Sequence, residues 1–157
     1  MNRICVNDEL LLSCPEGFAV MSADELNRLY ACGDSHRWGA WDRERHVMLT
    51  VLWQRYNPLL MMLADMKSLA RRNEQLTQKG YEGHDYQLKG FLTRRVCGLN
   101  GEGYRFTYRL GDVVQSVETV LIKRKNHVYS LNCIGRDADE AGNHELFEAV
   151  LDGIRMK

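Results

Sequence analysis

Hydrophobic and polar residues alternate at the start of the chain in a pattern that predicts a β-hairpin. In the segment "RICVNDELLLSC", apolar residues occupy every second position on both sides of Asn7-Asp8. These two residue types tolerate the left-handed backbone of a tight turn. We therefore expect two short antiparallel strands, ended by Pro15 and Gly17.

Strand-like runs recur further along the chain. The segment "WGAWDRERHVMLTVLWQRY" has two β-rich runs around the charged turn "DRER", which predicts a second hairpin. Four more runs cover residues 87–93, 104–110, 113–122 and 127–134. The links "NGEG", "LGD" and "KRKN" are typical of turns, so these four strands are expected to form an antiparallel meander.

Three segments have the three- and four-residue spacing of amphipathic helices. Ser22 and Glu25 have the spacing of a capping box, which predicts a helix over residues 23–31. Pro58 suits a helix start, and the apolar spacing after it predicts one helix of about twenty residues that ends at Gly80. A third helix is expected after "DADE", with Leu146, Phe147, Val150, Leu151 and Ile154 on one face.

The order of these elements predicts an α+β fold. Its sheet is antiparallel, with about six or more strands supplied by two hairpins and a meander, and helices flank it. A chain of 157 residues suits one domain with its own core, so we assign residues 1–157 to a single domain.

Composition narrows the classes of function. Apolar residues make up 45% and charged residues 27% of the chain, as in folded globular proteins. Lys plus Arg equals Asp plus Glu at 21 each, so no net charge attracts the protein to nucleic acid or to an anionic membrane. The basic residues of the chain, including Lys123, Arg124 and Lys125, are interpreted as solvent-exposed residues of turns.

Localisation is expected to be cytoplasmic. The first residues lack the apolar run of a secretory signal, and the longest apolar run, "PLLMMLA", is too short to span a bilayer. The five cysteines are an odd number without a CxxC pair, which favours reduced, mostly buried thiols.

Several phrases resemble a known superfamily. The segments "LLSCPEGF", "DRERHVMLTV", "GYRFTYRL" and "HVYSLNCI", in this order around a long helix, resemble the PsbP-like/Mog-type fold. This superfamily includes plant photosystem lumenal proteins, the eukaryotic Ran-binding Mog protein and small bacterial proteins. The resemblance implies helices on both faces of the sheet and a non-enzymatic role in binding or chaperoning proteins, as in type VI secretion chaperones of similar fold. It carries no catalytic residue over to this chain.

Two groups of residues are candidates for binding a partner. Leu59, Leu60, Met61 and Met62 are consecutive, and one helix face cannot hold all four, so one or two must point away from the main apolar stripe. The second group, Tyr104, Phe106 and Tyr108, alternates along one strand and shares one face. The aromatic group either packs in the core beneath a helix or lines an apolar groove.

An alternative site lies in "CGDSHRWGAWDRERH". Cys32, His36 and His46, with Asp34 and Asp42, are residue types that bind transition metals or support catalysis. The segment lacks the CxxC and HExxH spacings, and the chain has no GxxxxGK[ST] phosphate loop. Polar residues around a hairpin turn explain the composition without a site.

The sequence therefore favours a non-catalytic, cytoplasmic protein- or peptide-binding domain, adaptor or chaperone-like. We assign no catalytic residue, no metal and no cofactor, and its partner is expected to be a protein or peptide, not nucleic acid or a membrane. The alternative is a small-molecule or metal-handling enzyme using Cys32, His36 and His46. The partner's identity and the oligomeric state are left open.

Overall fold

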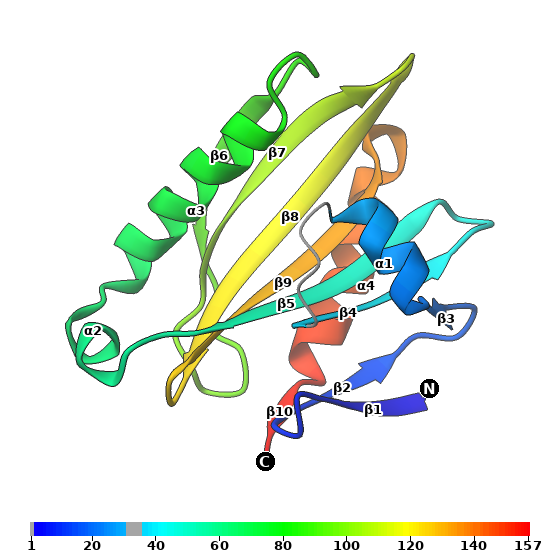
Figure 1. The fold of residues 1–157 in the computed structure, drawn as a ribbon. Coiled ribbons are helices and arrows are strands. Elements are labelled where there is room, and N and C mark those ends of the chain that lie inside the picture. Colours follow the sequence, from blue (N-terminus) through cyan, green and yellow to red (C-terminus); the bar gives the residue numbers. More distant parts are fainter. Residues whose placement is uncertain (1, 31–35) are drawn as a thin grey trace.

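A seven-stranded antiparallel sheet forms the middle layer of the computed structural model, which describes residues 2–30 and 36–157 (Figure 1). Its strand order is β3-β4-β5-β9-β8-β7-β6. The strands are β3 (Ala19–Val20), β4 (Arg37–Asp42), β5 (Val47–Arg55), β6 (Gln87–Thr93), β7 (Glu102–Leu110), β8 (Val113–Arg124) and β9 (His127–Arg136). The second hairpin and the four-strand meander are thus confirmed, and their strands pair antiparallel.

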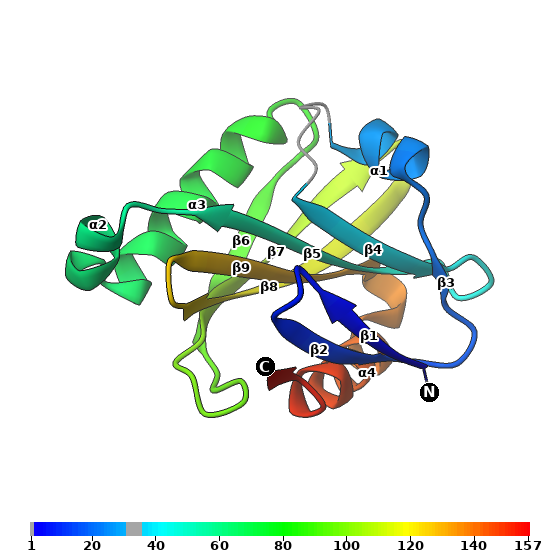
Figure 2. The same ribbon diagram turned by 60° about the horizontal axis from the view of Figure 1, so that its bottom comes forward.

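A second sheet contains the first hairpin. Strands β1 (Asn2–Val6) and β2 (Leu10–Cys14) pair antiparallel, and the short strand β10 (Arg155–Met156) pairs with β2. Asn7 and Asp8 have φ angles of 54° and 53°, which confirms the left-handed turn. In this sheet β2 lies between β1 and β10, which come from the two ends of the chain, and the three strands lie below the main sheet in Figure 2.

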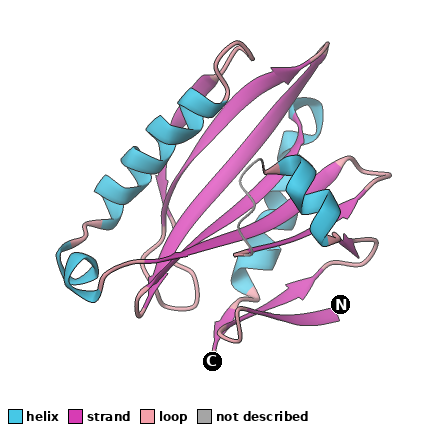
Figure 3. Ribbon diagram, viewed as in Figure 1, coloured by secondary structure: helices cyan, strands magenta, loops and turns pink. Residues whose placement is uncertain are grey.

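Helices cover both faces of the main sheet (Figure 3). Helix α1 (Ala23–Leu29) and helix α3 (Met66–Gly80) pack on one face, whereas α4 (Glu140–Asp152) and the small sheet pack on the other. A 3-10 turn (Asp137–Asp139) leads into α4. The capping box of Ser22 and Glu25 is present, with hydrogen bonds of 3.0 and 3.2 Å in the two directions.

The main core lies between the main sheet and the layer of α4 and the small sheet. Val47, Leu49, Val51 and Trp53 share one face of β5 and are buried, as their spacing predicts. They belong to one apolar cluster that also holds Tyr129 from β9 and Phe147, Val150, Leu151 and Ile154 from the C-terminal segment. The apolar stripe of the third predicted helix is therefore confirmed.

The prediction of one helix from Pro58 to Gly80 is wrong. The segment forms helix α2 (Pro58–Leu63) and then α3, because Ala64 adopts an extended conformation with ψ 121°. Asp65 begins α3 as its N-cap and accepts hydrogen bonds from the backbone N–H of Lys67 at 3.4 Å and from the Ser68 hydroxyl at 3.0 Å. The break turns α2 out from the line of α3 (Figure 1).

Candidate binding surface

Helix α2 exposes most of its large apolar side chains. Asn57 caps the helix by accepting a hydrogen bond from the N–H of Leu59 at 2.9 Å, and Pro58 follows it. Met61 points inward and is buried against α3, β8 and β9, and its carbonyl accepts a hydrogen bond from Lys123. The exposed members are Leu59 (66%), Leu60 (60%), Met62 (83%) and Leu63 (78%), which we call the α2 apolar surface.

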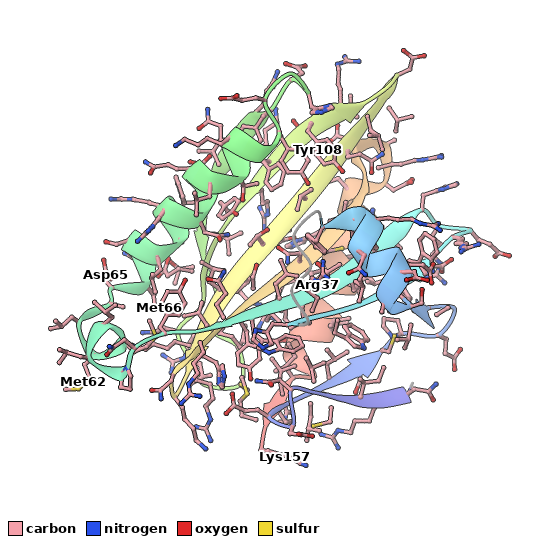
Figure 4. All side chains as sticks on the ribbon, viewed as in Figure 1. Arg37, Met62, Asp65, Met66, Tyr108 and Lys157 are labelled. Carbon is pink, nitrogen blue, oxygen red and sulfur yellow. The ribbon has the colours of Figure 1, made fainter. Side chains whose placement is uncertain are left out.

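More of the four consecutive residues point outward than the one or two that were expected. Three of them, Leu59, Leu60 and Met62, are exposed, because the helix ends after six residues and no element among the described residues covers its outer side. Figure 4 shows Met62 at the outer edge of the molecule, pointing away from the sheet.

A groove lies between α3 and the edge strand β6. Its volume is about 230 Å³, and Lys67, Ala70 and Arg71 from α3 line one wall. The other wall holds Phe91, Leu92, Thr93 and Glu102. Phe91 is half-exposed, so an apolar ring and two cationic side chains are accessible in one groove. Lys67 follows α2 closely in the chain.

The aromatic strand residues belong mainly to the core. Tyr104 and Phe106 are only 1% and 2% exposed, because α3 and Tyr81 cover this face of β7. Tyr108 is partly buried and its ring centroid lies 4.4 Å from that of Tyr81. Burial is the main reason that the pKa of Tyr108 lies far above its ordinary value, and the neighbouring Tyr81 raises this pKa further. Tyr104 and Phe106 therefore pack in the core and do not line an exposed apolar groove.

The structure does not bring His36 and His46 together. His36 adjoins the Arg37 end of the β4–β5 ladder, where its ring centroid lies 5.9 Å from that of Trp53. His46 is exposed in the turn at the opposite end and has a φ angle of 56°. Six residue pairs separate them, roughly 20 Å at about 3.3 Å per residue. Cys32 and Asp34 lie outside the described residues.

Asp42 has a role in the turn. Its Oδ1 atom accepts hydrogen bonds from the backbone N–H groups of Glu44 and Arg45 at 3.1 and 3.2 Å. These bonds stabilise the segment "DRER" as a turn, which agrees with the simpler interpretation of its charged residues.

One group within residues 2–30 and 36–157 has the donor atoms and the spacing to hold a metal ion: Glu118, His144 and Glu148. This group was not predicted from the sequence. His144 and Glu148 are four residues apart on the predicted third helix, which was a usable signal, but Glu118 joins them only through the packing of α4 on the sheet.

The basic residues are spread over different partners. Arg94 forms ion pairs with Glu148 and Asp152 at 2.9 and 2.6 Å, and Arg105 pairs with Glu118 at 3.2 Å.

Within the part of the chain that the structure describes, no helix has the length and apolar composition to cross a bilayer.

These layers define the class of protein: an α+β sandwich with an antiparallel sheet between helices. No family model matches the chain, and no curated protein matches it in sequence. Among solved structures, cyanobacterial PsbP from Synechocystis has a TM-score of 0.75 at 14% identity, over 99% of this chain and 92% of that chain.

The Ran-binding protein Mog1p of Saccharomyces cerevisiae has a TM-score of 0.63 at 8% identity, over 98% of this chain and 94% of that chain. A Pseudomonas aeruginosa protein of unknown function has a TM-score of 0.51 at 10% identity, over 97% of this chain and 94% of that chain. At such identities the likeness establishes the fold alone. The chain has the PsbP-like/Mog-type fold.

Proposed function

We propose that this chain is a non-catalytic, cytoplasmic protein-binding domain of adaptor or chaperone type. It holds a protein or peptide partner against the α2 apolar surface. The observation that carries the proposal is the exposure of four large apolar side chains, Leu59, Leu60, Met62 and Leu63, on one six-residue helix.

Such a surface has a physical cost that binding removes. Apolar area left in water costs about 25 cal/mol per Å² relative to buried area, and contiguous exposed apolar patches mark interaction sites. The Met62 side chain also adapts to partners of different shape, since methionine is unbranched and polarizable. The surface therefore suits an apolar segment of a partner.

Three further observations support the proposal. The cysteines Cys5, Cys14, Cys97 and Cys133 are free, as is usual in a reducing cytoplasm. Mog1p, which shares the fold, is a Ran-binding protein, so a fold of this type is compatible with protein recognition. Lys67 and Arg71 in the adjacent groove favour a partner segment that carries acidic residues near its apolar ones.

Site-specific crosslinking in the native organism tests the location of the surface. A photoreactive phenylalanine analogue at position 62 is expected to crosslink one defined partner protein. The same analogue at position 110 is the control, because Leu110 is also 60% or more exposed but lies at the β7–β8 turn. Equal crosslinking at both positions, or none at position 62, would contradict the proposal.

Substitution then tests whether the surface supplies affinity. The double variant Leu60→Ser and Met62→Ser is expected to weaken capture of that partner at least tenfold, because central apolar contacts each contribute about 1–2 kcal/mol. Its free energy of unfolding should stay within about 0.5 kcal/mol of the parent value, since both side chains are exposed. Leu110→Ser, matched to Leu60 in exposure, should leave capture unchanged.

A further inference from the structure

Three side chains with metal-ligand atoms converge between strand β8 and helix α4. Glu118 comes from β8, whereas His144 and Glu148 lie one turn apart on the same face of α4. One ligand atom from each residue lies within 4.8 Å of those from the other two. The Nδ1 atom of His144 is 2.8 Å from Oε2 of Glu118. Two packed elements thus hold one imidazole and two carboxylates around a common point.

Two arginines orient these carboxylates. Arg94 donates from Nε and Nη2 to Oε2 of Glu148, at 3.0 and 2.9 Å. Arg105 donates to Oε1 of Glu118 at 3.2 Å. Each arginine therefore holds one oxygen of its carboxylate, and the Oε2 atom of Glu118 faces His144. Hydrogen bonds of this kind fix the orientation of metal-binding carboxylates in many sites.

The charges around the cluster leave it electronegative. The carboxylates of Glu118, Glu148 and Asp152 face the guanidinium groups of Arg94 and Arg105, which leaves one surplus negative charge when His144 is neutral. Glu140 adds another carboxylate along the small cavity beside His144. A partly enclosed site with surplus negative charge attracts a cation.

The same cavity has room for a further ligand. Its volume is about 20 Å³, and Glu118, Asn143 and His144 are among the residues that line it. A space of this size holds about one water molecule. Three protein ligands and one water make the coordination number that zinc adopts in open sites.

Cys133, which pairs with Glu118 across the sheet, does not join the ligand set. Its Sγ atom donates a hydrogen bond to the backbone carbonyl of Asn143 at 3.8 Å and is not one of the clustered ligand atoms.

We propose that Glu118, His144 and Glu148 bind one divalent first-row transition-metal cation, with water completing the coordination. The site goes beyond the proposed function and lies on the α4 face of the sheet, opposite the face that packs against α3. A metal held there links α4 to β8 directly. This link is expected to stabilise the packing of the helix on the sheet.

Zinc titration of the full chain tests the site. Cys5→Ser and Cys32→Ser form the background, so that these two thiols do not compete for the metal. After treatment with EDTA and its removal, we expect one Zn²⁺ per chain by calorimetry and elemental analysis, with a rise in the thermal midpoint. His144→Ala and, separately, Glu118→Gln should each weaken Zn²⁺ binding at least tenfold and remove the thermal shift.

Two variants outside the cluster serve as matched controls. Glu145 lies next to His144 on α4 but is exposed, and Glu145→Gln removes its charge. His84→Ala removes an exposed imidazole elsewhere in the chain. Both should bind Zn²⁺ like the background protein. Circular dichroism in EDTA establishes that each variant is folded before titration. Zn²⁺ affinity that survives both cluster substitutions in folded protein, or no Zn²⁺ binding by the background protein at tenfold excess, overturns the proposal.

Discussion

Tyr104 joins the aromatic strand to helix α3 through its hydroxyl group. The side-chain amide of Asn73 donates to this oxygen at 2.7 Å, and the Thr77 hydroxyl lies 2.8 Å away. Alternation along β7 predicted that Tyr104, Phe106 and Tyr108 share a face. It did not decide whether that face is covered, because the covering helix is distant in sequence. The burial of Tyr104 and Phe106 removes these two residues from the candidate binding surface.

Replacing Tyr104 by phenylalanine is expected to lower the free energy of unfolding by about 1–2 kcal/mol. The ring stays in place, but the amide of Asn73 loses an acceptor in a partly buried position. Urea unfolding measures the change. Tyr56→Phe is the control, since the Tyr56 hydroxyl donates only to the exposed Gln54 side chain at 3.0 Å. Equal losses in the two variants would contradict this account of Tyr104.

At the scale of elements, local patterns predicted the type of most segments but not the break between α2 and α3. Apolar residues keep helical spacing across Ala64 and Asp65, so periodicity alone joins the two helices. Asp65 is a strong helix N-cap residue, and that local signal was available. The break matters for function because it separates the exposed helix α2 from the helix that packs on the sheet.

The capping role of Asp65 predicts different effects for two substitutions. Asp65→Ala should lower the free energy of unfolding by about 1 kcal/mol, because the N–H of Lys67 loses its acceptor. Asp65→Asn should retain most of the stability, since asparagine caps helices about as well as aspartate. Thermal and urea unfolding compare the two. A loss of the same size in both variants would assign the effect to charge and not to capping.

At the scale of the whole molecule, sequence reasoning predicted the strands of the hairpins and meander but not their division into two sheets. Turn chemistry is local, so it correctly paired consecutive strands from β4 to β5 and from β6 to β9. The pairing of β2 with β10 joins opposite ends of the chain, and two residues of β10 have too little pattern to detect. The metal-binding cluster was missed for the same reason, since Glu118 and His144 meet only after the sheet and α4 have packed.

Tyr129 connects the two sheets and provides the test of this architecture. Its hydroxyl donates to Glu9 at 2.5 Å and accepts from Asn7 at 3.1 Å, so the first hairpin turn is tied to strand β9. Tyr129→Phe should therefore loosen the small sheet selectively. Hydrogen exchange is expected to accelerate about tenfold or more in β1 and β2, which corresponds to at least about 1.4 kcal/mol. Exchange in β7 and β8 serves as the internal control, and a uniform change across both sheets would mean that the two sheets unfold as one unit.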